Sequence, residues 1–388
     1  MRVLQVIPSV RPESGGTGRS ISALCTALAN VGVDTILYAA HAPGDNLTIE
    51  PGSEAYEVKL FSAAAGRLYA SYLIFKHINA IGNEFDLIHL HSIWNPIVTA
   101  AAAAARKSRV PYVLSPHGML NKVCLKRRQT LKRVCSALYE RNTVERAVSL
   151  QFSSSNDSRD SRVSWFNYPE HFLAPNGIDL GGAQIDAGAF RKRFPELADK
   201  QILLFLGRLH SIKGLNLQFQ AFEKLIGKYP NLRWVLIGPD DGEWERVDRL
   251  GRDAGLDSYI RWLGPMLGAE RFDALAAADV VLQSSFYECH SMTINEALAV
   301  GAPLVITDTA NFDAVQRIGA GYVVPRDPLK FATAIDSILQ SPEKAEQMRK
   351  AGRQFAEEEL NWSHIATRVK AAYTQILSGS GKSHSRRE

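Results

Sequence analysis

The chain has 388 residues, of which 46% are hydrophobic and 22% charged, a composition typical of a well-packed soluble protein with roughly two or three domains. The net charge of +5 is too small to predict a nucleic-acid partner, and no apolar run approaches the ~20 residues of a membrane span. A strand pattern begins at the amino terminus, so no signal peptide is expected, and the cysteines show no closely spaced metal-site pair, which favours reduced thiols in the cytoplasm.

The first half alternates apolar strand patterns with helix patterns. Strands are predicted at residues 3–7, 34–39, 86–91, 112–115 and 149–153, and helices at residues 19–30, 68–81, 96–107 and 122–146. This alternation is typical of a doubly wound parallel sheet covered by helices.

The second half repeats the scheme after the turn signal Pro175-Asn-Gly177. Strands are predicted at residues 202–206, 233–237, 259–263, 280–283, 303–307 and 321–324, with a helix at 215–228. We therefore predict an α/β fold with two Rossmann-like parallel-sheet domains facing a cleft, residues 1–178 and 179–361. Residues 362–377 form a final helix, and the polar tail 378–388 is expected to be disordered.

A glycine-rich loop containing Gly15 and Gly16 follows the first strand and opens a helix. Glycines let the backbone approach a phosphate closely, so both are candidate donor-binding residues, although a plain tight turn has the same composition. A dehydrogenase would carry an acidic residue after the second strand. Residues 37–41 contain none, which argues against a dinucleotide cofactor.

His117 follows the strand at residues 112–115, and Gly118 allows a ligand to approach it. A single histidine is more often a structural hydrogen-bonding group, but the position after a parallel strand makes His117 a catalytic candidate. His89 and His91, at the end of the preceding strand, are weaker candidates.

The first strand of the second half is followed by Arg208 and Lys213 on a loop bounded by Gly207 and Gly214. Ligands of open α/β sheets bind beyond the carboxyl ends of strands. Two cations there can bind a diphosphate and stabilise it as a leaving group. The alternative is two solvated loop charges.

The most informative segment is Glu288-Cys-His-Ser-Met-Thr-Ile-Asn-Glu296. Ser291 is a predicted N-cap, so the amides of Ser291, Met292 and Thr293 lack intrahelical partners at the positive end of a helix. This arrangement suits a phosphate, and the two flanking glutamates suit hydroxyl groups. An amphipathic helix with a surface glutamate at each end is the alternative.

Positive charge is concentrated in the predicted helix at residues 122–146, which also carries apolar residues at helical spacing. Such a helix can lie on an anionic membrane or bind an anionic acceptor, or it can be an ordinary solvated helix. The candidate residues are Lys122, Lys126, Arg127, Arg128, Lys132 and Arg133.

Taken together, these motifs resemble those of the retaining nucleotide-sugar glycosyltransferases of family four, which have the GT-B fold. The likeness extends from Met1 to about residue 377 and includes, in the family's order, Gly15-Gly16, Pro116-His117-Gly118, Pro175–Asp179, Gly207–Gly214 and Glu288–Glu296. The stretch 115–140 resembles the subgroup that builds bacterial surface polysaccharides.

The resemblance implies a hexosyltransferase that moves a sugar from a nucleotide diphosphate sugar to a glycan or lipid-linked acceptor, with retention, in exopolysaccharide, O-antigen or lipopolysaccharide synthesis. It implies that Arg208, Lys213, the Gly16 loop and the amides at Met292 and Thr293 bind the diphosphate. Glu288 would bind sugar hydroxyls, Glu296 the ribose, and His117 the reacting sugar. No metal or other cofactor is implied, and the location is the cytoplasm or the inner face of the plasma membrane.

The family usually has Gly-Phe-Gly or Gly-Phe-Ser after the first glutamate, where this chain has Cys289-His290-Ser291. This departure keeps open a non-catalytic relative that binds a nucleotide sugar. An epimerase or phosphorylase of the same fold is a separate alternative. The sequence does not identify the sugar, nucleotide, acceptor, linkage or oligomeric state. The central prediction is that Arg208, Lys213, Glu288 and Glu296 meet at one diphosphate-bearing ligand.

Overall fold

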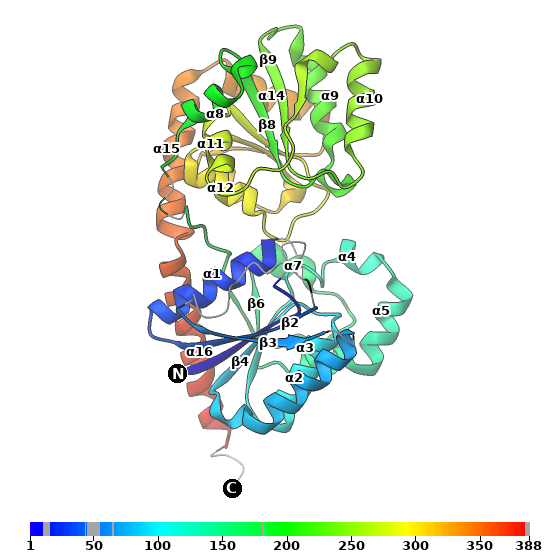
Figure 1. Ribbon diagram of the computed structural model, residues 1–388, viewed down its shortest axis with the longest axis vertical. Coiled ribbons are helices and arrows are strands. Elements are labelled where there is room, and N and C mark those ends of the chain that lie inside the picture. Colours follow the sequence, from blue (N-terminus) through cyan, green and yellow to red (C-terminus); the bar gives the residue numbers. More distant parts are fainter. Residues whose placement is uncertain are drawn as a thin grey trace. The chain divides into compact units, whose positions relative to one another are not determined.

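The protein is described by a computed structural model that covers residues 1–10, 16–42, 44, 55–63, 66–180, 182 and 184–384. It divides into two compact units (Figure 1). Unit 1 consists of Met1–Gly177 together with Trp362–Glu388, and unit 2 consists of Ile178–Asn361. The chain thus returns to unit 1 for its last helix, α16.

Unit 1 is built on a seven-stranded sheet in the order β3-β2-β1-β4-β5-β6-β7, and every pair of neighbours is parallel. The strands are β1 Arg2–Ile7, β2 Asp34–His41, β3 Glu57–Ser62, β4 Leu87–His91, β5 Tyr112–Ser115, β6 Ser149–Phe152 and β7 His171–Leu173. The predicted parallel sheet is confirmed. The sequence patterns missed β3 and β7, because both are edge strands with few buried side chains and lack the continuous apolar run of a central strand.

Helices cover both faces of this sheet (Figure 1). They are α1 Gly16–Asn30, α2 Arg67–Ile81, α3 Pro96–Lys107, α4 Lys122–Lys126, α5 Gln129–Cys135, α6 Arg141–Glu145, α7 Ser155–Ser161 and α16 Trp362–His384. The start of α3 shows why helix boundaries could be predicted from the sequence. The Asn95 side chain accepts a hydrogen bond from the Ile97 amide, and Pro96 occupies the first helical position.

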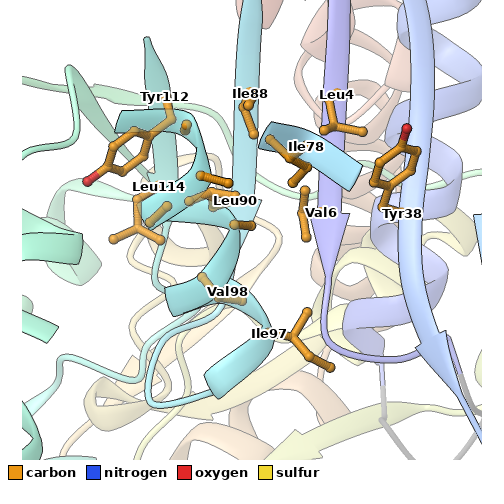
Figure 2. Packing of buried hydrophobic residues seen from close by; sticks show 14 of the residues in the cluster. Leu4, Val6, Tyr38, Ile78, Ile88, Leu90, Ile97, Val98, Tyr112 and Leu114 are labelled. Carbon is orange, nitrogen blue, oxygen red and sulfur yellow. The ribbon is translucent and has the colours of Figure 1, made fainter. Parts of the chain in front are cut away.

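Alternating residues of β1 point to opposite faces of the sheet. Leu4 and Val6 pack with residues of α2 and α3 on one face (Figure 2). Val3 packs on the other face with residues of α1 and α16. The period of two that defines a strand therefore assigns each face its own helices.

The basic segment, residues 122–146, does not form the single helix that was predicted. It forms α4, α5, a π-helical turn at Ser136–Glu140, and α6, and it breaks where Arg128 adopts a left-handed backbone with φ 54°. Leu125 and Val144 reach the core, while the apolar residues between them stay exposed. A straight helix with one apolar face cannot produce that pattern.

The last helix is longer than predicted, because α16 runs to His384 rather than ending at residue 377. The prediction of a disordered tail is therefore wrong for residues 378–384. Two glycines in this stretch each cost a helix about 1 kcal/mol relative to alanine, which does not end it here. Residues 385–388 lie outside the described part of the chain. None of the helices in the described ranges combines the length and apolar character needed to cross a bilayer.

Unit 2 contains a six-stranded parallel sheet in the order β10-β9-β8-β11-β12-β13. Its strands are β8 Gln201–Leu206, β9 Leu232–Ile237, β10 Ile260–Trp262, β11 Val280–Gln283, β12 Leu304–Thr307 and β13 Gly321–Val324. Its helices are α8 Ala187–Arg193, α9 Leu215–Ile226, α10 Trp244–Asp253, α11 Glu270–Ala277, α12 Met292–Val300, α13 Ala314–Arg317, α14 Pro328–Leu339 and α15 Pro342–Glu359.

The two faces of this second sheet also have separate cores. Leu204 of β8 packs with residues of α11 and α12, whereas its neighbour Phe205 packs with residues of α9 and α14. Because β8 and β11 are parallel neighbours, the loops that follow them emerge at the same edge of the sheet. This edge carries most of the charged residues selected from the sequence.

Packing of α16 onto unit 1 is expected to contribute to the stability of that unit. Ile365 is 1% exposed and shares a cluster with Val3 and Leu28. We expect Ile365→Ala to lower the free energy of unfolding by about 2–5 kcal/mol, the cost of a buried cavity. Urea denaturation of the full-length protein measures this change.

The matched control is Gln375→Ala, an exposed position on the same helix, which should change stability by less than about 0.5 kcal/mol. Equal stabilities for the two variants would show that α16 contributes no buried packing.

Candidate functional site

The loop between β8 and α9 is shaped to present Lys213. Its His210 side chain accepts a hydrogen bond from the Ile212 amide, 3.0 Å from Nδ1, and so caps a short 3-10 turn at Ser211–Lys213. Gly214 then adopts a left-handed backbone with φ 66°, and a Cβ there would collide with the Ser284 carbonyl. Only glycine lets this loop approach the end of β11 so closely.

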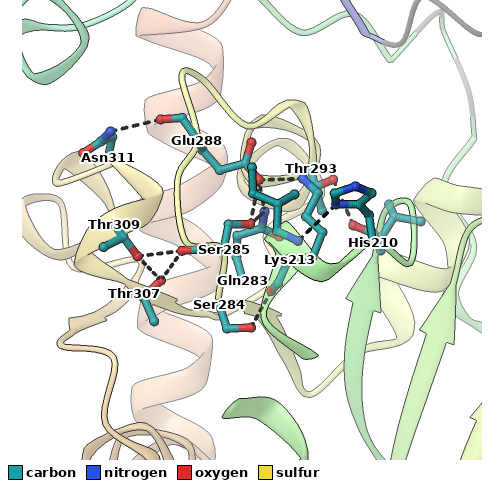
Figure 3. Close-up of polar contacts among 12 residues, drawn as sticks. His210, Lys213, Gln283, Ser284, Ser285, Glu288, Thr293, Thr307, Thr309 and Asn311 are labelled. Carbon is teal, nitrogen blue, oxygen red and sulfur yellow. Dashed lines mark hydrogen bonds and ion pairs between the residues drawn. The ribbon is translucent and has the colours of Figure 1, made fainter. Parts of the chain in front are cut away.

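Lys213 and Glu288 form an ion pair at this edge (Figure 3). Lys213 Nζ lies 2.5 Å from Glu288 Oε1, and the two side chains are only 20% and 15% exposed. Gln283 Nε2 and Ser285 Oγ also donate to Oε1, at 2.9 and 2.6 Å. The carboxylate is therefore held in one orientation by three donors.

The backbone around Glu288 is fixed by hydroxyl and amide side chains (Figure 3). Thr309 Oγ1 donates to the Ser285 carbonyl at 2.6 Å, and Asn311 Nδ2 donates to the Glu288 carbonyl at 3.0 Å. Ser284 Oγ donates to the Lys213 carbonyl at 2.9 Å, which ties the β11 loop to the β8 loop. The site is thus preorganised by polar contacts rather than by packing alone.

The start of α12 lies beside the same strands. Ser291 occupies the N-cap position, as predicted, but its hydroxyl makes no capping hydrogen bond to the first turn. Thr293 Oγ1 instead donates to the Leu206 carbonyl at the end of β8, at 3.1 Å. The amides of Met292 and Thr293 belong to the first turn of the helix, where backbone N–H groups lack intrahelical acceptors.

The other two charged candidates have partners that the sequence analysis did not select. Arg208 NH1 lies 3.1 Å from Asp241 Oδ2, and both side chains are exposed. Glu296 is buried within α12, and its Oε1 lies 3.0 Å from Arg271 Nε of α11. Lys213 and Glu288 are therefore in direct contact, while Arg208 and Glu296 are each held by a separate ion pair.

The departure at Cys289-His290 is accommodated by aromatic packing. The His290 ring lies 5.2 Å from the Phe312 ring, centroid to centroid. An aromatic residue in the family's usual motif could make the same kind of contact. The substitution thus preserves a ring at this position while removing the glycine before it.

In unit 1, His117 follows β5 with a positive φ of 48°, an uncommon conformation for a residue other than glycine. Its Nε2 lies 3.1 Å from Nδ1 of His91 on β4. Burial lowers the pKa of His117 to about 4. Burial, together with the neighbouring His89 and His117, holds the pKa of His91 well below its usual range. Both rings are therefore neutral near pH 7.

A cavity of about 670 Å³ lies in unit 1, beyond the ends of β1, β2 and β4, and Trp94, Met119, Arg127 and Lys132 line part of its wall. Glu140, fully buried in the π-helical turn, accepts a hydrogen bond from the Trp94 amide at 2.8 Å. Lys132 Nζ donates to the Cys124 carbonyl at 2.6 Å and lies 5.8 Å from the Trp94 ring centroid. This cavity is a candidate binding site for an acceptor.

The remaining basic candidates are exposed. They are Lys122, Lys126, Arg127, Arg128 and Arg133. Gly16 begins α1, but Gly15 lies outside the described residues. Within the described ranges no group of three or more His, Cys, Asp or Glu side chains could hold a metal ion.

Several residues that build these sites escaped the sequence analysis: Gln5, Tyr373, Asp241, Arg271, Gln283 and Ser285. Gln283 and Ser285 flank a strand end, a signal that could have been used. Gln5 is a fully buried polar residue in the core strand β1 that hydrogen-bonds Tyr373, and a polar position in an apolar strand could have been noticed. Tyr373 itself gave no local signal.

Comparison with known proteins matches both halves of the chain. The model described as "Glycosyltransferase Family 4" matches residues 14–181, and that described as "Glycosyl transferases group 1" matches residues 186–355. D-inositol 3-phosphate glycosyltransferase of Kineococcus radiotolerans is 26% identical over 87% of this chain and 85% of its own.

Solved structures show the same fold. Sucrose-phosphate synthase of Thermosynechococcus elongatus aligns with a TM-score of 0.79 at 19% identity, covering 98% of this chain and 100% of that one. HepE of Anabaena, solved in complex with UDP, aligns with a TM-score of 0.77 at 15% identity, covering 97% and 100%.

The buried carboxyl of Glu140 predicts a pH-dependent stability. Burial raises its pKa from 4.5 to about 7, so the folded protein binds this proton more tightly than the unfolded chain does. The resulting stability is fully present below the unfolded pKa and is lost as the pH rises through the folded pKa. We expect the gain in unfolding free energy from Glu140→Gln to be about 3 kcal/mol larger near pH 8 than near pH 4.

Urea denaturation at the two pH values measures the difference. Glu170→Gln, at an exposed position, is the control and should show the same effect at both. A pH-independent effect of Glu140→Gln would mean that the pKa of Glu140 is the same in the folded and unfolded states.

Proposed function

The chain belongs to the family-four glycosyltransferases of the GT-B fold, and from this premise we propose that it transfers a hexose-type sugar from a nucleoside diphosphate sugar to an acceptor hydroxyl, with retention at the anomeric carbon. The observation that carries the proposal is the Lys213–Glu288 pair, held at the carboxyl edge of the unit 2 sheet beside the start of α12.

We assign the donor diphosphate to the cations at this edge. Lys213 and Arg208 follow β8, and the first-turn amides of Met292 and Thr293 present positive partial charge from the helix. The 3-10 turn at Ser211–Lys213 and the left-handed Gly214 fix the backbone that carries Lys213, while Arg208 is exposed beside Asp241. This charge replaces the metal ion that would otherwise neutralise the leaving group, so we propose a metal-independent enzyme.

We assign the sugar hydroxyls to Glu288 and the ribose hydroxyls to Glu296. In the described residues the donors to the Glu288 carboxylate all meet Oε1, which leaves Oε2 to accept from a sugar hydroxyl. Arg271 Nε donates to Oε1 of the Glu296 carboxylate, and the ribose is assigned to the same carboxylate. HepE was solved with UDP, which supports a nucleotide ligand for this fold.

The proposed reaction occurs on one face of the sugar. The bond from the anomeric carbon to the leaving phosphate oxygen breaks as the acceptor oxygen bonds to the same face, and the acceptor's proton passes to that phosphate oxygen. Lys213 and Arg208 stabilise the negative charge that develops on the diphosphate. His117 of unit 1 is assigned to the reacting sugar as a hydrogen-bonding group.

We further propose that the acceptor is a glycan or lipid-linked glycan of a bacterial surface polysaccharide, bound at the cytoplasmic face of the membrane. The basic segment supports this, because Leu131, Val134 and Leu138 are 56%, 51% and 71% exposed among its cations. Exposed apolar side chains interleaved with Lys and Arg suit an anionic bilayer surface. The alternative ligand of this segment is a soluble anionic acceptor, which would contact the Lys and Arg side chains but not the apolar ones.

The donor site is tested by Lys213→Ala. Loss of one contact to the leaving group should lower kcat/KM by about 10²- to 10³-fold, measured as nucleoside diphosphate release with the donor that thermal-shift screening of nucleoside diphosphate sugars selects. Lys228→Ala is the matched control, because Lys228 of unit 2 also pairs with a carboxylate, Asp336, at 2.7 Å, but away from this edge.

Near-normal turnover by a folded Lys213→Ala variant would refute the assignment. An epimerase would convert the donor sugar without any acceptor, which analysis of the sugar product detects. A binding protein would bind the donor in the thermal-shift screen without releasing nucleoside diphosphate or changing the sugar.

Membrane docking is tested with vesicles containing anionic phospholipid. Replacing Leu131, Val134 and Leu138 by serine should release the protein even at low salt, because it removes the apolar contact. Neutralising Lys126, Arg127 and Arg128 should weaken binding by about 1 kcal/mol per charge.

The matched control neutralises Lys224, Lys330 and Lys350, which are exposed on unit 2 and should leave binding unchanged. Vesicle binding that survives the serine substitutions would show that Leu131, Val134 and Leu138 make no membrane contact and would reject this docking proposal.

A further inference from the structure

A chain of buried polar side chains runs through the sheet of unit 1 to His117. Its members come from four strands and the last helix: Gln5 of β1, His89 and His91 of β4, Ser115 of β5, Gln151 of β6 and Tyr373 of α16. Gln5, His89 and Tyr373 are 0% exposed. Apolar packing alone does not explain why these polar side chains are buried in the core.

In this hydrogen-bond chain, the donor and the acceptor of every bond can be assigned from one backbone carbonyl, that of Ala174. Gln151 Nε2 donates to the Ala174 carbonyl at 3.1 Å, and a carbonyl can only accept, so Gln151 Oε1 must face Ser115. Ser115 Oγ therefore donates to Gln151, at 2.8 Å. Because its single proton is used there, it accepts from His89 Nε2, at 2.6 Å.

The same logic continues from His89 toward Gln5. A neutral His89 with its proton on Nε2 has an acceptor at Nδ1, so the Tyr373 hydroxyl donates to it, at 2.5 Å. The Tyr373 oxygen then accepts from Gln5 Nε2 at 3.2 Å. This orients the Gln5 amide with Oε1 toward His91.

The last two links reach His117. Gln5 Oε1 accepts from His91 Nε2 at 2.8 Å, so the neutral His91 ring offers Nδ1 as an acceptor. His117 Nε2 donates to it at 3.1 Å. The proton of His117 is therefore on Nε2, and no described residue hydrogen-bonds its Nδ1.

All three imidazoles must be neutral for this order to hold, and their surroundings favour that state. Burial, with a smaller effect of His117, lowers the pKa of His89 from 6.5 to about 3. A second proton on His89 or His91 would place two donors against each other within the hydrogen-bond chain. Every hydrogen bond in the hydrogen-bond chain then has one donor and one acceptor, and each proton takes part in one bond.

We propose that this hydrogen-bond chain fixes the tautomer of His117, so that Nδ1 is always presented to the ligand as an acceptor for a hydroxyl group. Tyr373 and Ser115 are then positioning residues that act through His91. The assignment of that hydroxyl to the donor sugar rests on the proposed function, whereas the tautomer itself does not. The last helix, by supplying Tyr373, takes part in setting the chemistry of a loop in the first half of the chain.

The tautomer is read directly in the ligand-free, full-length protein by long-range 1H–15N correlation of the histidine rings, with His117→Gln to assign the signals. Wild type should show the proton on Nε2 of His117. In Ser115→Ala, His89 loses its acceptor, and the whole chain is expected to reverse and place the His117 proton on Nδ1. Tyr373→Phe breaks the chain between His89 and Gln5 and should shift His117 toward the same form.

Two matched controls separate the chain from general damage to the core. Ser149→Ala removes a buried hydroxyl from β6, and Tyr112→Phe removes one from β5 that bonds only backbone carbonyls and Arg106. Both should keep the proton on Nε2 and keep the wild-type transfer rate. Ser115→Ala and Tyr373→Phe should lose roughly tenfold in transfer rate, the effect of one hydrogen bond.

A wild-type His117 that carries its proton on Nδ1, or a proton that remains on Nε2 in both Ser115→Ala and Tyr373→Phe, overturns the proposal whatever the activity. A tautomer that shifts as expected in a protein without transferase activity would support this inference and reject the proposed function, so the two failures are distinguishable.

Discussion

Glu288 is the residue on which the geometry of unit 2's functional edge depends. Its carboxylate joins Lys213 from the loop after β8 to Gln283 and Ser285 at the end of β11. Both members of the ion pair are largely buried, so removing either would leave a charge without compensation at low exposure. The pair therefore holds two loops together and keeps a cation ready for an anionic ligand, which links the stability of this edge to its proposed chemistry.

The hydrogen-bond chain that leads to His117 in unit 1 is built from uncharged side chains. The histidines of β4 are kept neutral by burial, and neutral imidazoles can each donate once and accept once, which suits a directed hydrogen-bond chain. Such a chain transmits orientation rather than charge. It lets Tyr373, near the end of the sequence, influence a histidine that follows β5, and it gives α16 a role beyond covering one face of the sheet.

The basic segment shows how a local break changes the meaning of a sequence pattern. Its apolar residues are spaced as if for one buried helix face, yet the left-handed backbone at Arg128 and the π-helical turn divide them. Leu125 and Val144 enter the core, and Leu131, Val134 and Leu138 remain on the surface. The same residues that would have been core in a continuous helix become a surface that a membrane or an anionic acceptor could contact.

The central strands, the parallel sheets and the edge at which Lys213 and Glu288 lie could be predicted from the amino-acid sequence, because continuous apolar runs, glycine turns and strand-end motifs are local signals. The Arg271–Glu296 and Arg208–Asp241 pairs, the edge strands β3 and β7, and the Gln5–Tyr373 contact were decided only by tertiary structure. Each depends on residues brought together from separate elements, and a local pattern does not encode such distances. The proton order that ends at His117 is of this second kind: it follows from one carbonyl, at Ala174, and exists only when four strands and the last helix are assembled.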